Sequence, residues 1–151
     1  MSHKVIATNR KAKFEFFLLE NFEAGIVLRG SEIKSIRAGH ISINEAYVQL
    51  TGLNAWLVGA NISPYDPASR ENHLPTRDRQ LLLNKHELKE LWEGIQKKGL
   101  TIIPVQVYLK NGRAKVNIAL AKGKKLFDKR RSIAEKEIAR EIRRVGKKEN
   151  R

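Results

Sequence analysis

Alternation of apolar and polar side chains is the feature of this sequence that most restricts its fold. Apolar residues recur at every second position in three stretches, residues 14–28, 46–62 and 103–120. A period of two turns one face of a segment toward a core and the other toward solvent, which is typical of β-strands. A polar or glycine-containing break divides each stretch, at Glu20-Asn21, Thr51-Gly-Leu-Asn54 and Asn111-Gly112. We therefore predict three hairpins, or six strands.

Two segments break this alternation and predict helices. Between Gly30 and Gly39, Ile33 and Ile36 stand three positions apart, and Ser31 is a candidate cap. Residues 85–98 have the stronger helical pattern, with a capping residue before them, four apolar side chains at helical spacing and a glycine stop: Asn84, Leu88, Leu91, Trp92, Ile95 and Gly99.

Six strands and two inserted helices predict a mainly β fold, a small closed antiparallel six-stranded barrel in which closure removes exposed edges. A chain of 151 residues with 41% apolar content can bury one core. Residues 63–79 hold three of the four prolines and show no period. We expect a long loop there, of the kind that is often functional.

Positive charge is concentrated at the C-terminus. Residues 122–151 contain 13 Lys or Arg and five Asp or Glu, which is +8 of the net charge of +14. Ile138, Ile142 and Val145 form a thin apolar stripe, so a third helix is possible but marginal without a surface to bind. We predict a folded domain at 1–121 and a basic tail at 122–151, disordered when free and helical when bound.

Composition restricts the chemical class of partner that this protein can bind. A pI near 10.2 favours a polyanion, because Lys and Arg release condensed counterions from nucleic acid. Anionic membrane is the rival, but the apolar side chains of the tail are too sparse for confident insertion. No long apolar run or signal peptide is visible, which predicts a soluble, cytoplasmic protein. There is no cysteine and the four histidines are dispersed, so we expect no metal and no cofactor.

Several sequence blocks occur in an order and spacing that are specific in combination. They are Asn9-Arg-Lys-Ala12, Phe22-Glu-Ala-Gly-Ile-Val-Leu28, Gly30-Ser-Glu-Ile-Lys-Ser-Ile-Arg-Ala-Gly39, Leu81-Leu-Leu-Asn-Lys85, Asn111-Gly-Arg-Ala-Lys-Val116 and Ala119-Leu-Ala-Lys-Gly-Lys-Lys-Leu-Phe-Asp-Lys-Arg130. From about Lys4 to the C-terminus the chain resembles the SsrA-binding protein family.

The resemblance implies a function that composition alone does not give. Members of that family have an OB-type barrel that holds the tRNA-like domain of transfer-messenger RNA (tmRNA). They help it enter ribosomes stalled on messages without a usable stop codon, in trans-translation. The tail is then expected in the empty decoding centre and messenger channel of the small subunit. An elongation factor that delivers aminoacyl-tRNA is expected in the same complex, and the protein itself catalyses no covalent chemistry.

Motif matching places family RNA contacts at Asn9, Glu23, Leu82 and Lys115, with phosphate partners nearby at Lys11, Lys34 and Arg37. The residues alone leave other interpretations open. Glu23 could be a turn residue in a hairpin, and Leu82 could be plain core packing. Each of the three neighbouring cations could be only a solvated charge.

Tail positions are assigned in the same way. Lys122, Lys124 and Lys125 would neutralise phosphate, and Asp128-Lys129-Arg130 matches the decoding-centre motif of the family. Phe127 could stack on a ribosomal base. Without the resemblance, Lys129-Arg130-Arg131 would be a solvated basic run, and Phe127 could fold back on the barrel.

Two other classes of function remain open from the residues. A generic structured-RNA or ribosomal RNA-binding module would also explain the barrel and the charge. An RNA-modifying enzyme would need a convergent acid and base, for which the candidates are His73 near Asp78 and His86 next to Glu87. Such a pair is far more often a satisfied surface contact than a catalytic dyad.

Overall fold

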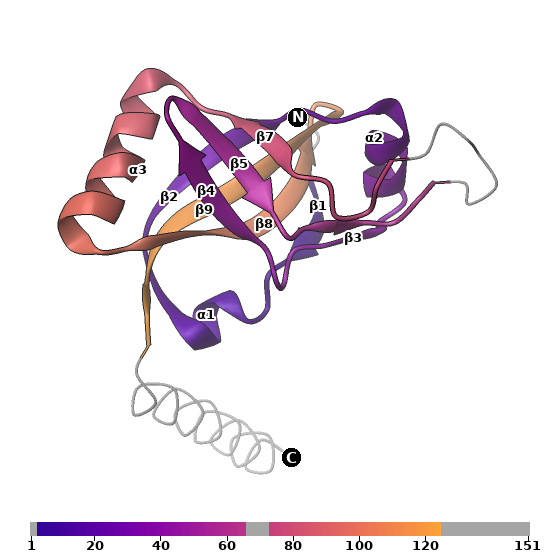
Figure 1. The fold of residues 1–151 in the computed structure, drawn as a ribbon. Helices are drawn as coiled ribbons and strands as arrows, with labels where there is room; N and C mark the ends of the chain where they lie inside the picture. The colour runs from indigo at the N-terminus through magenta and orange to yellow at the C-terminus, as the bar shows by residue number, and fades with distance from the viewer. Residues whose placement is uncertain (1–2, 66–72, 125–151) are drawn as a thin grey trace, which may run out of the picture.

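In the part of the chain that the structure describes, the fold is an antiparallel sheet of seven strands that curls around the main core, with three helices attached. A computed structural model describes residues 3–65 and 73–124 (Figure 1). The sheet order is β1-β8-β9-β2-β7-β5-β4, and β3 and β6 form a separate pair. The elements are β1 (His3–Thr8), α1 (Ala12–Glu15), β2 (Phe16–Ile26), α2 (Gly30–Arg37), β3 (Ile41–Ser42), β4 (Tyr47–Thr51), β5 (Asn54–Val58), β6 (Asn61–Ile62), β7 (Arg79–Leu82), α3 (Lys85–Lys98), β8 (Thr101–Lys110) and β9 (Arg113–Gly123).

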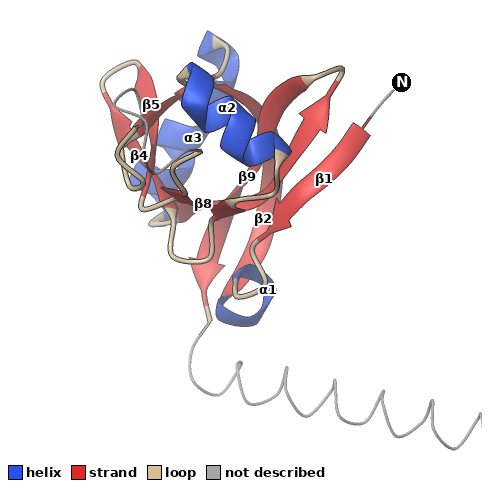
Figure 2. Ribbon diagram, turned by 90° about the vertical axis from the view of Figure 1, so that its right-hand side faces the viewer, coloured by secondary structure: helices blue, strands red, loops and turns tan. Residues whose placement is uncertain are grey.

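The prediction of a closed six-stranded barrel was wrong in strand number and in closure. The ladder has two ends, β1 and β4, and β4 comes close to β8 without a paired register between them. Irregular registers in β1, β2 and β8 fall at Val5/Ala7, Leu18/Glu20 and Pro104/Gln106. Bulges bend and twist strands, and Pro104 has no N–H to give to a ladder, so the sheet curls strongly without closing (Figure 2).

The predicted hairpin at residues 14–28 is also wrong. Residues 12–15 form the short helix α1, and 16–26 form one continuous strand along β9. The polar Glu20-Asn21 does not reverse the chain. The register with β9 shifts between Leu18 and Glu20, and Glu20 and Asn21 still pair with β9 in the same ladder.

The other two hairpins are confirmed. β4 pairs with β5, and β8 pairs with β9. Asn111 and Gly112 have φ of 52° and 79°, the left-handed pair that a tight hairpin turn requires. The sequence did not indicate β7, which pairs with β2 on one side and β5 on the other where the loop at 63–79 was expected to end.

Both core helices are confirmed, and they lie at opposite ends of the curled sheet (Figures 1 and 2). Asn84 accepts a hydrogen bond from the Glu87 amide at 2.9 Å, and Gly99 ends α3 with φ of 62°. The expected cap of α2 is wrong, because Ser31 contacts His73 instead and Glu32 accepts from the Arg29 amide at 2.7 Å. Within the described ranges, each helix is too short or too polar to span a bilayer.

A buried ion network joins α2 to the start of β7. Glu32 and Arg79 have no exposed surface, and Arg79 Nε donates to Glu32 Oε2 at 2.6 Å. Arg77 also donates to Glu32. Burial opposes ionisation of Glu32, but the hydrogen bonds from Arg77, the Arg29 amide and Arg79 outweigh it and lower the pKa to about 2. This network fixes α2 beside the groove described next.

Candidate RNA interface

A shallow groove of about 380 Å³ lies where β7, β2 and β9 run side by side. We call it the Leu82–Lys115 groove; its lining is Gly25, Ile26, Leu28, Ile33, Leu82, Gly112, Arg113, Ala114 and Lys115. Gly25 pairs with Leu82 across one edge of β2 and with Lys115 across the other. A Cβ on Gly25 would lie 3.3 Å from Leu82 Cβ, so glycine keeps the floor low between the two side chains.

Leu82 is a surface residue and not part of the core. Its exposed fraction is 54%, whereas that of its neighbour Leu81 is 3%. A strand turns successive side chains to opposite faces, so Leu81 fills the core and Leu82 faces the groove. Core packing, which the sequence left open for Leu82, is thereby excluded.

Glu23 lies on the same face of β2 as Gly25, next to the groove. It stands opposite Asn117 in the ladder, so the interpretation as a turn residue is wrong. The Tyr108 hydroxyl donates to Glu23, and Lys110 lies 3.4 Å from it. The Tyr108 hydrogen bond is the main reason that the pKa of Glu23 is lowered, with Lys110 and Lys115 adding to it against burial. The lowered pKa favours the charged form of Glu23, which pairs with Lys110.

The two predicted phosphate partners on α2, Lys34 and Arg37, contact different parts of the structure. Arg37 Nη2 donates to the Gly112 carbonyl at 3.3 Å, which places Arg37 at the β8–β9 turn and the rim of the groove. Lys34 Nζ lies 5.5 Å from the centre of the Tyr65 ring. The structure thus brings Glu23, Leu82, Lys115 and Arg37 together and directs Lys34 toward Tyr65.

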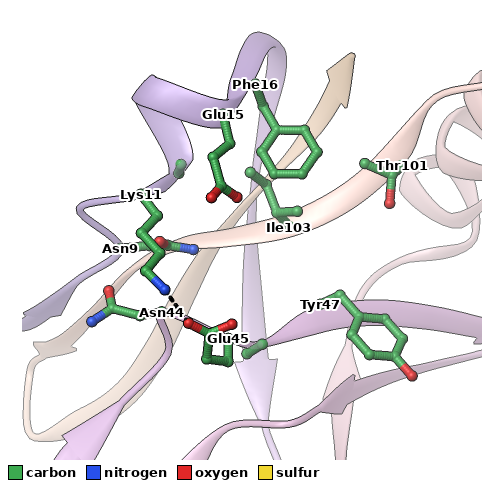
Figure 3. A pocket seen from close by; sticks show the side chains of 11 residues that line it. Asn9, Lys11, Glu15, Phe16, Asn44, Glu45, Tyr47, Thr101 and Ile103 are labelled. Atoms are coloured by element: carbon green, nitrogen blue, oxygen red, sulfur yellow. Dashed lines mark hydrogen bonds and ion pairs between the residues drawn. The ribbon is translucent and has the colours of Figure 1, made fainter. Parts of the chain in front are cut away.

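Asn9 and Lys11 belong to a second pocket, on the α1 side of the sheet (Figure 3). Asn9 is 5% exposed, and its Nδ2 donates to the Pro104 carbonyl at 2.9 Å. Lys11 forms an ion pair with Glu45, whose hydrogen bond and charge raise the pKa of Lys11. The sequence motifs did not indicate that these two residues lie apart from the Leu82–Lys115 groove.

The last described residues continue β9 past the predicted domain boundary. Lys122 is exposed opposite Phe17, and the Lys124 ammonium donates to the Lys13 carbonyl at 2.8 Å, 5.1 Å from the Phe17 ring centre. The ladder extends to Gly123, beyond the expected end of the domain at residue 121. The remaining tail positions, Lys125, Phe127, Asp128, Lys129 and Arg130, lie outside the described residues.

Comparison with known proteins assigns the family. The family model described as SmpB protein matches residues 6–148. The chain belongs to the SmpB family. The match includes most of the tail, so both the sheet and the basic C-terminal segment fall within the SmpB pattern.

Relatives named SsrA-binding protein are similar in sequence to this chain over nearly its whole length. The SsrA-binding protein of Sulfurihydrogenibium sp. is 51% identical over 142 residues, covering 94% of this chain and 93% of the relative. That of Desulforudis audaxviator is 48% identical over 144 residues, covering 95% and 94%. A solved structure described as "tmRNA-SmpB: a journey to the center of the bacterial ribosome" superposes with a TM-score of 0.67 at 40% identity, covering 80% of this chain and 85% of that one.

The sequence motifs did not indicate three further residues at or beside the Leu82–Lys115 groove: Tyr108, Lys110 and Arg113. Tyr108 is buried and stacks on His3 with ring centres 4.5 Å apart. Burial and the hydrogen bond to Glu23 raise its pKa. The sequence feature that points to these residues is the Asn111-Gly112 turn, because residues on either side of a tight turn are brought together across the hairpin.

The histidines considered for catalysis have other contacts. His73 is buried, with Nδ1 at 2.9 Å from Ser31 Oγ and Nε2 at 2.8 Å from the Ile62 carbonyl. His86 lies 2.9 Å from Glu90, one helical turn along α3, and not against Glu87. Neither contact joins the histidine to the carboxylate considered as its partner, Asp78 for His73 and Glu87 for His86.

Proposed function

We propose that this chain binds the tRNA-like domain of tmRNA and delivers it to stalled ribosomes for trans-translation. The observation that carries the proposal is the near-full-length match to SmpB, together with a groove that Leu82 and Lys115 line and that Glu23 adjoins on the same face of β2. Relatives named SsrA-binding protein and a structural neighbour described as tmRNA-SmpB in the ribosome support it.

The chemistry of the groove fits a folded RNA. Leu82 and Ile33 offer apolar surface to a base or ribose, while Lys115, Arg113 and Arg37 surround it with cations. Structured RNA is recognised through unstacked bases, sugar hydroxyls and phosphates, which need this mixture of apolar and basic groups. In this proposal the curled sheet is the OB-type platform that the resemblance implied.

The tail has a second role in the proposal. Lys122, Lys124 and Lys125 contact phosphate as the chain leaves the sheet, and Phe127, Asp128, Lys129 and Arg130 act in the small-subunit decoding centre and messenger channel. An elongation factor that delivers aminoacyl-tRNA belongs to the same complex. The chain performs no covalent chemistry, works in the cytoplasm where ribosomes are, and leaves peptidyl transfer to the ribosome.

A competition assay tests the proposal. Full-length protein and a chain ending at Lys124 are titrated with the tRNA-like domain against excess bulk tRNA at near-physiological salt. The shorter chain keeps all of β9 and the contacts of Lys124. We expect both proteins to prefer the tRNA-like domain, and only the full-length protein to support tagging on stalled ribosomes.

The alternative function gives a different result in the same assay. A generic structured-RNA module would bind both RNAs equally, with a steep salt dependence, and would lose most of its affinity with the tail. Equal binding of the two RNAs would overturn the proposal.

A further inference from the structure

A tyrosine two strands away contacts Glu23. The order of the sheet at this point is β8-β9-β2, with Tyr108 on β8 and Glu23 on β2. Neighbouring strands are about 4.8 Å apart, so roughly 10 Å separates the two backbones. The Tyr108 side chain crosses β9, and its hydroxyl donates a hydrogen bond to Glu23 Oε2. A phenol is long enough for this contact, whereas a serine or threonine hydroxyl at the same position is not.

Both side chains lie on the face of the sheet that carries the Leu82–Lys115 groove. Tyr108 pairs with Lys115 across the β8–β9 ladder, and Lys115 pairs with Gly25 on β2. Residues opposite each other in a ladder point to the same face, and so do residues two apart in one strand, such as Glu23 and Gly25. The hydrogen bond between Tyr108 and Glu23 therefore forms beside the groove.

The Tyr108 ring has little freedom to move. It is buried, and the His3 imidazole stacks on it with ring centres 4.5 Å apart and planes inclined by 13°. A buried tyrosine hydroxyl needs a hydrogen-bond partner, and Glu23 provides one. Tyr108 is thus a rigid donor at a fixed point.

Glu23 is a flexible side chain that remains accessible. It is 41% exposed, so a ligand can reach its carboxylate. Tyr108 engages Oε2, and Oε1 lies 3.4 Å from the ammonium of Lys110, which is itself exposed. That contact is longer than the roughly 2.8 Å typical of charged hydrogen bonds, so Tyr108 is the stronger restraint. A carboxylate has about four acceptor positions, so Glu23 can accept further hydrogen bonds from a ligand.

We propose that Tyr108 is a positioning residue for RNA binding, which holds the Glu23 carboxylate in one orientation as an acceptor for an N–H or O–H donor of the RNA. The inference rests on the proposed function in placing RNA at this face. A glutamate that moved freely would lose rotamer entropy on binding, and it would turn away from nearby phosphates because like charges repel. The hydrogen bond from Tyr108 removes both effects before the RNA arrives.

NMR spectroscopy of the free full-length protein tests the positioning directly. Tyr108→Phe keeps the ring and its stacking on His3 but removes the donor. In the wild type, the Hα–Hβ couplings of Glu23 should indicate one χ1 rotamer, and in Tyr108→Phe they should average. The pKa of Glu23, followed at its carboxyl carbon, should rise toward the ordinary value, because the Tyr108 hydrogen bond is the largest cause that lowers it. Unchanged couplings in Tyr108→Phe would overturn the proposal, whatever the pKa does.

A double-mutant cycle tests the consequence for RNA affinity. Tyr108→Phe should weaken binding of the tRNA-like domain about fivefold, the loss expected from one hydrogen bond. In a Glu23→Ala background the same change should have no effect, because the group that Tyr108 positions is absent. Tyr65→Phe, which removes a phenol hydroxyl outside the groove lining, is the matched control and should bind like the wild type.

Two outcomes of the cycle would overturn the positioning role. Full affinity of Tyr108→Phe would show that the orientation of Glu23 does not matter, and an equal loss in both backgrounds would show that Tyr108 acts only on the fold. The cycle is measured with the tRNA-like domain and with bulk tRNA. Equal wild-type affinity for the two RNAs would contradict the proposed function and leave the coupling measurable on each. A missing coupling with the preference retained would overturn only the role of Tyr108.

Discussion

Glu32 links the stability of the fold to pH. Its folded pKa of about 2 lies below the ordinary value of 4.5, so its stabilising contribution is fully present above pH 4.5 and is lost as the pH falls toward 2. Because the side chain is fully buried, the shift corresponds to about 3 kcal/mol. We expect urea unfolding to show a loss of this order between pH 5 and 2, beyond that of the other carboxylates.

Glu32→Gln measures that contribution directly. Removing the charge leaves Arg79 buried without its counter-ion, which should cost roughly 3–5 kcal/mol at pH 7. The variant should also show a flatter pH dependence below 4.5. Glu20→Gln is the matched control and should change neither property. Unchanged stability of Glu32→Gln at pH 7 would mean that the network is not stabilising.

Leu82 and Lys115 should affect RNA binding in different ways. Leu82→Ala removes exposed apolar surface, so stability should hardly change while affinity for the tRNA-like domain falls about tenfold at every salt concentration. Lys115→Ala should reduce the slope of log affinity against log salt by about one, as expected for one lost phosphate contact. Lys97→Ala, on α3 away from the groove lining, is the control for charge. If Lys115→Ala leaves the slope unchanged, Lys115 does not contact phosphate.

Sequence motifs identified the residues of the groove but not their grouping. A motif carries residue type and spacing, whereas the position of Asn9 depends on hydrogen bonds to Pro104 and Val105, about 95 residues away. Leu82 was ambiguous because three leucines in a row show no period. Its orientation became clear only from the ladder of β7 with β2.

At the scale of elements, α3 is fixed to the sheet through a glycine. A Cβ on Gly94 would lie 2.7 Å from Leu120 Cδ2, closer than packed atoms allow, and Leu120 is buried in the core. Gly94→Ala gains about 1 kcal/mol of helix propensity but should lose about 1–3 kcal/mol to overpacking. We expect net destabilisation, measured by thermal or urea unfolding.

A second substitution separates the packing effect from the propensity effect. Leu120→Val makes room beside residue 94, so the double variant should be less destabilised than the two single changes together. Simple additivity of the two changes would show that the close approach of α3 to β9 does not determine the cost.

Elements with local signals were predictable, and those that depend on distant partners were not. The Asn111-Gly112 turn and the Asn84-to-Gly99 helix carry their own start and stop residues. β2 appeared divided because Glu20-Asn21 resembles a turn, but its partner β9 is about 100 residues away and keeps both halves in one ladder. β7 has four residues and gains its stability from two non-local neighbours, so no local pattern marks it.

At the scale of the whole molecule, the proposal divides the work between the groove and the tail. The described residues include β9 to its end at Gly123, and the strands of the sheet and the named lining of the Leu82–Lys115 groove all come from residues 3–65 and 73–124. That remaining segment has 11 Lys or Arg and five Asp or Glu, so its removal takes away much of the nonspecific attraction to RNA. Truncation alone therefore cannot separate a decoding-centre motif from bulk positive charge.

A matched pair of triple variants makes that separation. Asp128→Ala with Lys129→Ala and Arg130→Ala removes two positive charges and one negative charge, and Lys147→Ala with Lys148→Ala and Glu149→Ala removes the same charges farther along the tail. If the first motif acts in the decoding centre, both proteins should bind the tRNA-like domain with equal affinity, and only the first should lose tagging on stalled ribosomes. Tagging and RNA affinity are measured on the same preparations. Equal loss of tagging in both variants would assign the tail effect to charge, and full tagging by the first would exclude the decoding-centre role, because the two differ in position but not in net charge.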